Sequence, residues 1–316
     1  GIFSFMLFGY LLATVTVIIW GITFVCTKSL LQDFSALEIL FFRFIIAYIG
    51  LWIMNPKSEK IAKKDNLLFC FAGLSGVVLY QFSENIAINF TTASNVSVIV
   101  SICPLFTAII AQIFLKEKHI TPFFILGFII SIIGVFFVSL NGNIQLKINP
   151  KGDLLALFAG ICWGFYSLFV SMINKKEYNL ISSTRRIFFF AVIFMIPLMI
   201  IGNNISNITA NSDLINSMNV NLNFSENIQR FKNFLNVGNL LFLGLLASGF
   251  CFSAWNKACK LVGTVKISFG IYLIPVVTII FAFFTLHEKI SFMGLLGAIL
   301  TITGLFISNI KTSSKM

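Results

Sequence analysis

Charged residues are the scarcest class in this sequence: Asp, Glu, Lys and Arg make up 10% of its 316 residues, whereas hydrophobic residues make up 58%. A water-soluble protein of this size could not bury so much apolar surface. The apolar residues also form uninterrupted runs of the length that crosses a hydrocarbon core, about 20 residues of helix. Residues 154 to 174, 267 to 286 and 290 to 310, for example, contain no charged side chain. The scarcity of charge therefore predicts an integral, multi-pass membrane protein.

Motifs of enzymes and of ATP-driven pumps are missing as well. The sequence has no phosphate-binding glycine loop, nucleophile elbow or zinc-protease motif, and His119 and His287 stand apart at predicted helix ends. The six cysteines include no C-x-x-C pair, which argues against a zinc site or a disulfide framework. We therefore predict no enzymatic activity, no cofactor and no metal.

The long apolar runs predict helices rather than barrel strands, because they do not alternate polar and apolar residues as outer-membrane strands do. The predicted fold is an all-α membrane protein with ten transmembrane helices. Their expected positions are residues 5 to 27, 35 to 54, 67 to 88, 95 to 115, 121 to 140, 153 to 173, 180 to 201, 237 to 256, 266 to 286 and 290 to 310.

The net charge of +11 would suggest a nucleic-acid partner in a soluble protein. Here the basic residues lie mostly in short connections between apolar runs, where they set the orientation in the membrane. If the N-terminus is cytoplasmic, thirteen lysines fall on the cytoplasmic side and six basic residues on the other. The asymmetry predicts that both termini are cytoplasmic, in a plasma or inner membrane or in an organellar membrane, with the lipid bilayer and no nucleic acid as partner.

The sequence repeats itself, and the repeat defines two halves. Trp20 and Arg43 recur after 143 residues, and a second series recurs after 171 residues. The recurring pairs are Trp20 with Trp163, Arg43 with Arg186, Gly73 with Gly244, Asn85 with Asn256 and Pro104 with Pro275. Because each half has an odd number of spans, the second half must cross the membrane in the opposite sense, as in many secondary transporters. We predict inverted five-helix repeats at residues 1–145 and 150–312.

The change of offset places an insertion in the second half. Residues 203 to 236 are rich in Asn, Ser and Thr and contain few long apolar runs. Such a composition is typical of a segment that cannot bury enough apolar surface to fold alone. We therefore predict an Asn-rich loop over residues 203–236.

The order and spacing of these motifs, met twice, resemble the EamA domain of the drug/metabolite transporter superfamily. The first half carries W-G-x-x-F from Trp20, an arginine entering the next helix, N-x-A from Asn85, a helix around Pro104 and L-K-E-K at 115 to 118. The second half fills the matching places from Trp163 to L-H-E-K at 286 to 289. The resemblance covers nearly the whole chain apart from the insertion.

The resemblance implies a secondary transporter, an exporter or exchanger that moves small organic metabolites such as amino acids by alternating access around a central cavity. Its partner would be a small-molecule substrate. The alternatives are a carrier of nucleoside-like compounds such as S-adenosylmethionine or of sugar phosphates, and a membrane protein of the same fold that does not transport. Substrate, direction, coupling ion and oligomeric state stay open at this point.

Polar and aromatic residues within the apolar runs are candidates for lining that cavity. They are Trp20, Tyr80, Gln81, Asn85, Ser101, Trp163, Tyr166, Asn256 and Tyr272. Each tryptophan of the repeat precedes a glycine that permits close helix approach, so plain packing is an equal alternative. Each asparagine must find hydrogen-bond partners, and holding helices together would satisfy that need.

Arg43, Glu84 and Arg186 are charged candidates, because a charge at membrane depth must face the bundle interior, a water-filled cavity or the headgroups. The arginines could contact a substrate carboxylate, although Arg185 beside Arg186 favours a helix-end role. Glu84 could carry a coupling proton, but its repeat counterpart is Trp255.

Pro104 and Pro275 are hinge candidates. Both fall in the middle of predicted helices, where proline removes a backbone hydrogen bond. We expect a kink at each, and movement at these kinks is one way to open a cavity.

Overall fold

The computed structural model describes residues 2–57, 59–118, 120–140, 149–206, 219–220, 224–287 and 291–308, and these are almost entirely helical. The first half contains α1 (Ile2–Leu30), α2 (Ala36–Met54), η1 (Lys63–Asp65), α3 (Asn66–Ala72), η2 (Gly73–Leu79), α4 (Tyr80–Phe90), α5 (Ala93–Val100), α6 (Cys103–Leu115) and α7 (Pro122–Leu140). The second contains α8 (Pro150–Asn174), α9 (Leu180–Ser206), α11 (Phe224–Lys232), α12 (Phe234–Leu241), η3 (Phe242–Phe250), α13 (Cys251–Val262), α14 (Thr264–Ser268), η4 (Phe269–Leu273), α15 (Ile274–Thr285) and α16 (Phe292–Ser308).

Several of these elements join end to end into single membrane-length segments. Lys63–Phe90, Ala93–Leu115, Phe234–Val262 and Thr264–Thr285 each combine two or more of them. Within the described ranges, eight segments are long and apolar enough to cross a bilayer, and α7 and α16 are further apolar helices. The ten-helix, all-α class predicted from the sequence is confirmed.

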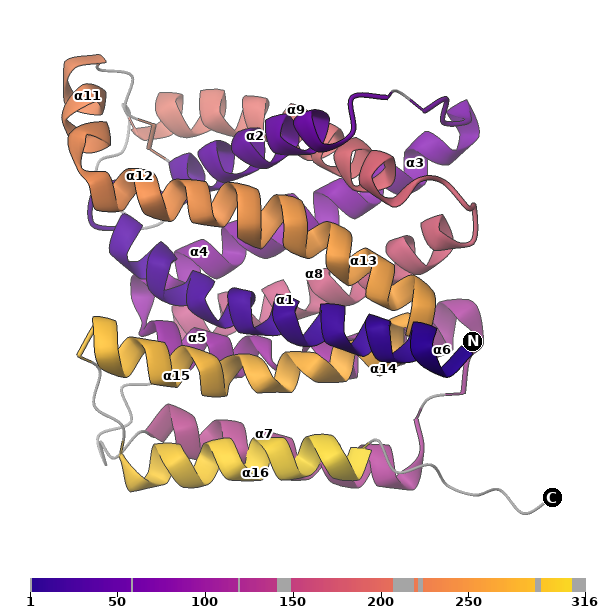
Figure 1. Ribbon diagram of the computed structural model, residues 1–316. Helices are drawn as coiled ribbons and strands as arrows, with labels where there is room; N and C mark the ends of the chain where they lie inside the picture. The colour runs from indigo at the N-terminus through magenta and orange to yellow at the C-terminus, as the bar shows by residue number, and fades with distance from the viewer. Residues whose placement is uncertain are drawn as a thin grey trace.

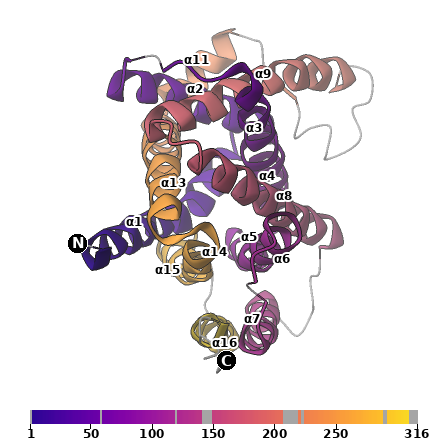
Figure 2. The same cartoon turned by 90° about the vertical axis from the view of Figure 1, so that its right-hand side faces the viewer.

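The helices run back and forth between two ends of one bundle. The start of α1 and the last turn of α16 lie at one end, which we call the near end, and α11 lies at the opposite, far end (Figure 1). Seen along the bundle, α7 and α16 lie side by side at its edge (Figure 2). Their backbones approach closely, because a Cβ built on Gly127 would stand 2.4 Å from the carbonyl oxygen of Gly304. Only glycine fits such a contact.

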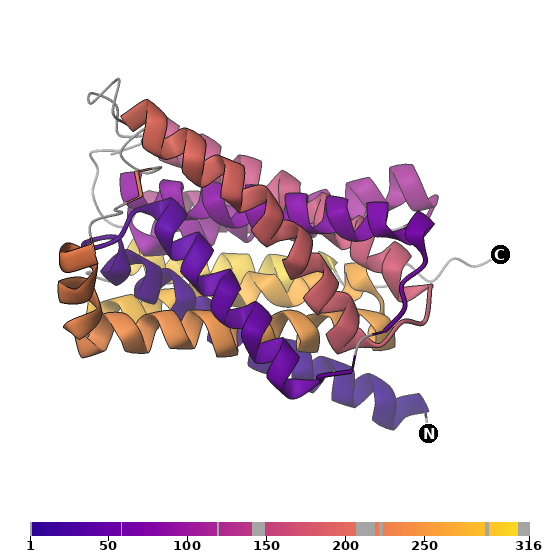
Figure 3. The same cartoon turned by 90° about the horizontal axis from the view of Figure 1, so that it is seen from above.

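A matched irregularity supports the inverted repeat. The π-helical segments η2 and η3 occupy corresponding places in the two halves, where Gly73 corresponds to Gly244. A Cβ on Gly73 would stand 2.6 Å from the Ile187 carbonyl of α9, and one on Gly244 would stand 2.5 Å from the Ile46 side chain of α2. The π-helices therefore bring α9 and α2 close to them in equivalent ways. Figure 3 shows α2 and α9 crossing the bundle obliquely.

The two prolines lie elsewhere than in mid-helix, so that part of the prediction is wrong. Pro104 is in the first turn of α6, and Pro275 is in the first turn of α15. The chain breaks or tightens just before each proline, at residues 101–102 and in the 3-10 helix η4. A first-turn proline costs no hydrogen bond, because the amide there has no helical acceptor. The proposed hinge role stays a prediction.

The insertion contains a helix rather than only a loop. In its described part α9 continues to Ser206 and α11 covers Phe224–Lys232, while residues 207–218 and 221–223 lie outside the described ranges. Arg230 of α11 forms a bidentate ion pair with Glu38 of α2 at 2.9 and 3.1 Å. A nine-residue helix is marginal alone. Composition could not reveal it, because contacts with the bundle stabilise it.

Candidate functional site

An aromatic cluster occupies the middle of the bundle, where the two halves meet. Trp20 of α1 and Trp163 of α8, equivalent residues of the repeat, meet edge to face with ring centroids 5.3 Å apart. Trp20 lies 5.0 Å from Trp255 of α13, and Trp163 lies 5.0 Å from Tyr80 of α4. Tyr166 continues the cluster 4.9 Å from Trp163. Four of the predicted candidates are thus brought together.

The two central tryptophans differ in how their indole N–H groups are satisfied. The N–H of Trp20 donates to the carbonyl oxygen of Ala247 at 2.9 Å. The N–H of Trp163 is buried and has no hydrogen-bond partner among the described residues. An unpaired donor inside a protein costs free energy, so a bound water or solute that accepts a hydrogen bond from this N–H would be stabilised.

A group of charged and polar side chains lies beside the cluster. Arg43 is 1% exposed; its Nε donates to the hydroxyl of Ser248 at 2.6 Å, and one terminal nitrogen donates to Oε1 of Gln81 at 2.7 Å. Glu84 lies one helical turn after Tyr80 and interacts with both the Tyr80 hydroxyl and the Arg43 charge. Three predicted candidates, one from α2 and two from α4, therefore form one buried polar group that reaches the second half through Ser248.

Tyr80 connects the polar group to the aromatic cluster, because its ring contacts Trp163 and its hydroxyl interacts with Glu84. The result is one buried, two-sided site. Phe252 belongs to the same cluster, because its ring centroid lies 5.6 Å from that of Trp20. Phe252, Trp255 and Ser248 are not among the candidates predicted from the sequence. The repeat indicates the positions of the two aromatic residues, because an offset of 171 residues makes Phe252 the counterpart of Gln81 and Trp255 the counterpart of Glu84.

The paired asparagines hold helices together. Nδ2 of Asn85 donates to the carbonyl oxygen of Ala36 at 3.2 Å. Asn256 accepts from the Tyr166 hydroxyl at 3.1 Å and donates to the Thr184 hydroxyl at 3.2 Å. These contacts favour the helix-fastening alternative for both residues.

Three other candidates lie apart from the site. Arg186 binds Oδ1 of Asn66 through two nitrogens, at 3.1 and 2.9 Å, at the near end of α9. Tyr272 stacks on Phe269 in a separate, smaller cluster. Ser101 lies at the break between α5 and α6, where its hydroxyl donates to the backbone carbonyl oxygen of Val98, three residues earlier.

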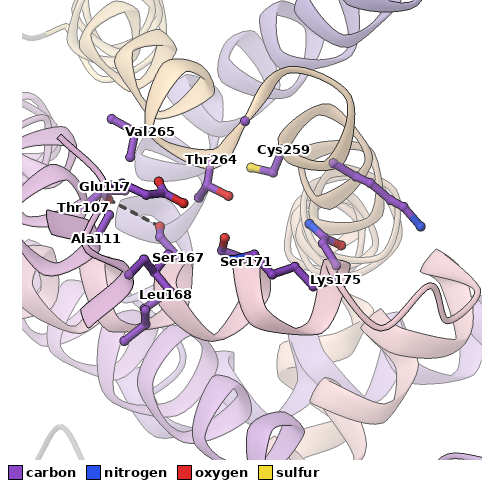
Figure 4. A pocket seen from close by; sticks show the side chains of 14 residues that line it. Thr107, Ala111, Glu117, Ser167, Leu168, Ser171, Lys175, Cys259, Thr264 and Val265 are labelled. Atoms are coloured by element: carbon purple, nitrogen blue, oxygen red, sulfur yellow. Dashed lines mark hydrogen bonds between the residues drawn. The ribbon is translucent and has the colours of Figure 1, made fainter. Parts of the chain in front are cut away.

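A cavity of about 220 Å³ opens at the near end, between α6, α8, α13 and α14. We call it the vestibule. Figure 4 shows the side chains that line it, among them Glu117, Ser171 and Thr264. Its lining also includes Lys175 and Lys260, so both signs of charge stand around it.

The vestibule leads toward the aromatic cluster. Thr107 and Ser167 close its inner end, with their hydroxyls 3.4 Å apart (Figure 4). Ser167 lies one helical turn after Trp163 on α8. Trp163, of the aromatic cluster, therefore lies one helical turn deeper in the bundle than this pair of hydroxyls.

Two EamA domains match the chain, at residues 7–140 and 150–310, under the description EamA-like transporter family. The chain belongs to the EamA-like transporter family. It is accordingly a multi-pass membrane carrier and not an enzyme, which confirms the predicted class.

Relatives across the family have similar length. An uncharacterized transporter of Archaeoglobus fulgidus is 26% identical over 96% of this chain and 97% of its own. A probable terminal-alkyne amino-acid exporter of Streptantibioticus cattleyicolor is 22% identical, with 94% and 92% covered. A probable amino-acid metabolite efflux pump of Escherichia coli is 25% identical, with 94% and 93% covered. A solved crystal structure matches with a TM-score of 0.68 and 14% identity over 96% of this chain and 98% of that chain, a likeness of fold alone.

Proposed function

We propose that this carrier exports amino acids or closely related zwitterionic metabolites by alternating access, and that they bind between the polar group and the aromatic cluster. The observation that carries the proposal is a buried guanidinium, that of Arg43, and a buried carboxyl group, that of Glu84, beside an aromatic cluster. Intramembrane charges are costly and mark substrate or ion sites. Two relatives named for amino-acid compounds support the same class of substrate.

The chemistry of the site is complementary to such a substrate. A guanidinium such as that of Arg43 pairs with a carboxylate by directed, charge-assisted hydrogen bonds. The Glu84 carboxylate suits an ammonium group, and the faces of Trp255 and Phe252 suit an apolar or aromatic side chain. The N–H of Trp163, which has no partner among the described residues, would supply one more donor for a carboxylate oxygen.

The vestibule is the proposed entrance. It opens at the near end, where exposed lysines gather around it and on the neighbouring connections, among them Lys57, Lys60, Lys116 and Lys175. Under the positive-inside rule that end is cytoplasmic. A carrier that is open to the cytoplasm and binds a metabolite there is arranged for export, with both termini inside.

The repeats at 1–145 and 150–312 are the two bodies whose relative movement exposes the site to either side. Because the halves are inverted, exchanging their conformations converts an inward-open carrier into an outward-open one. The same site is then exposed to either side of the membrane. The breaks before Pro104 and Pro275 are the places at which the helices can bend.

Flux measurements in vesicles test the proposal. Purified protein in lipid vesicles loaded with a mixture of labelled amino acids should release zwitterionic members faster than protein-free vesicles do. Arg43→Gln should abolish that release, whereas Arg186→Gln should retain it. If sugar phosphates or nucleosides moved and amino acids did not, the proposal would fail while the family assignment stood.

A further inference from the structure

The inverted repeat requires a counterpart of the vestibule at the far end. The vestibule lies between α6, α8, α13 and α14, and the equivalent helices of the repeat are α15, α1, α4 and α5. These elements occupy neighbouring places in the bundle (Figure 1), and α1 packs against both α15 and α5. The counterpart is therefore a definite place in the fold, which we call the far entrance.

The far entrance is closed. Where the vestibule has the half-buried Thr264, the far entrance has Ala93, which is 0% exposed. Thr107 of the vestibule corresponds to Thr278 of the far entrance; both side chains are buried, and the Thr278 hydroxyl donates to the carbonyl oxygen of Gly21 at 2.8 Å. That bond fastens α15 to α1. Of the equivalent positions Thr264 and Ala93, the one at the near end is thus half-buried and the one at the far end is fully packed.

One residue crosses the far entrance. Lys28 of α1 donates from Nζ to the carbonyl oxygens of Ile88 at 2.7 Å and of Thr91 at 2.8 Å, at the end of α4. The last carbonyls of a helix have no helical donor and carry partial negative charge, so a lysine amine suits them. The equivalent of Lys28 is Ser171, which lines the open vestibule and is too short to span the gap between its helices.

We infer that Lys28 is the gate residue of the far entrance: its amine bonds the end of α4 to α1 and holds that side shut while the vestibule is open. The inference rests on the alternating access proposed above. Opening toward the far side requires the amine to leave the α4 carbonyls, so removal of the amine favours the far-open conformation. A contact shifts the equilibrium between two conformations only if it stabilises one of them more than the other. The hydrogen bonds of Lys28 form in the far-closed conformation, so they stabilise that conformation.

Reaction of paired cysteines tests the gate without any transport assay. Ala93→Cys and Thr264→Cys, introduced separately, place thiols at equivalent positions of the far entrance and the vestibule. Purified protein in detergent is treated with a small charged methanethiosulfonate reagent, and mass spectrometry of peptides follows each thiol beside the native cysteines. In the otherwise unchanged chain, Thr264→Cys should react quickly and Ala93→Cys slowly.

Lys28→Met should reverse this order. We expect the rate at Ala93→Cys to rise about tenfold or more and the rate at Thr264→Cys to fall by a similar factor, the size of a typical conformational coupling. Lys28→Arg keeps the charge and the donors, so it should leave both rates near their starting values. Lys232→Gln removes a lysine charge on α11, at the same end of the bundle, and should change neither rate.

Other outcomes would overturn the gate. Rates that rise at both positions, together with a lower melting temperature, would show that Lys28 only caps α4 and that its loss loosens the bundle. Unchanged rates would show that the contact has no bearing on the entrance. Because labelling needs no solute, a protein that failed to move amino acids could still pass this test, and the two proposals fail independently.

Discussion

The two halves of this carrier share a scaffold and differ in the chemistry that they bring to its centre. In the first half, Arg43, Gln81 and Glu84 form a buried polar group. In the second half, the positions equivalent to Gln81 and Glu84 hold Phe252 and Trp255. One half therefore contributes charge and the other contributes aromatic surface. In the proposed site, this divergence between the repeats places the polar group of one half beside the aromatic residues of the other.

Arg43 and Arg186 show that neighbouring hydrogen-bond acceptors determine where an arginine side chain can be buried. Arg43 donates to Gln81 and to Ser248. The residues equivalent to those two acceptors in the other half are Phe252 and Val77, which cannot accept a hydrogen bond. A guanidinium is not buried without acceptors. Arg186 accordingly binds Asn66 near the helix end instead.

The largest expected effect separates these two arginines. Arg43→Gln should lower the flux of a zwitterionic amino acid about 100-fold, because hydrogen bonds to charged groups contribute about 1.5–3 kcal/mol each. Arg186→Gln should change flux by less than about threefold, because its partner is the half-buried Asn66 at the end of the bundle, away from the proposed site. Initial rates in vesicles, corrected for the amount of folded protein, give the comparison. Equal losses in both variants would place Arg43 in the scaffold and not in the site.

A smaller effect should separate the central tryptophans. Trp163→Phe removes an N–H that has no partner among the described residues, so the melting temperature should hardly change while KM rises about tenfold. Trp20→Phe removes the bond to Ala247, so it should destabilise the fold by about 0.6–1.7 kcal/mol, the range for hydrogen bonds between membrane helices. Its KM should change less.

Thermal unfolding in detergent and concentration-dependent flux, measured on both tryptophan variants, decide this prediction. A loss of stability in Trp163→Phe as large as that in Trp20→Phe would mean that both rings only pack.

The asparagines should differ in stability alone. Asn256→Ala breaks contacts with Tyr166 and Thr184, so it should cost about 1–3 kcal/mol, whereas Asn85→Ala breaks one contact, with Ala36, and should cost about half as much. Unfolding midpoints in denaturant provide the measurement. A KM change in either variant without destabilisation would return the asparagines to the substrate site.

The smallest expected effect concerns α11, which the first half lacks. Arg230→Gln removes the ion pair with Glu38, whose carboxylate side chain is 3% exposed, and should lower the melting temperature by a few degrees. Lys232→Gln, on an exposed side chain of the same helix, should leave it unchanged. Identical melting temperatures for both variants would mean that α11 adds no stability to the bundle.

The sequence was sufficient to predict the ten helices and to name most residues of the proposed site, because long apolar runs and two repeat offsets restrict the possible arrangements. It was insufficient where contacts between distant parts of the chain determine a helix boundary or the partner of a side chain. Pro104 was expected within a helix, but the chain breaks just before it. Tyr272 and Arg186 are of the same residue types as members of the proposed site, but Tyr272 stacks on Phe269 and Arg186 binds Asn66. The repeat offset relates Trp255 to Glu84 and Phe252 to Gln81, but only the packing in space shows that both aromatic residues contact Trp20.

The most direct test of the account compares one substrate in three chemical forms. Vesicles that contain the protein are supplied with a labelled aromatic amino acid, its methyl ester and its N-acetyl derivative. The ester lacks the carboxylate that Arg43 and Trp163 should bind, and the N-acetyl form lacks the ammonium that Glu84 should bind. We expect rapid flux of the free amino acid and flux at least about tenfold slower for each blocked form. Equal flux of all three would contradict a site built from opposite charges.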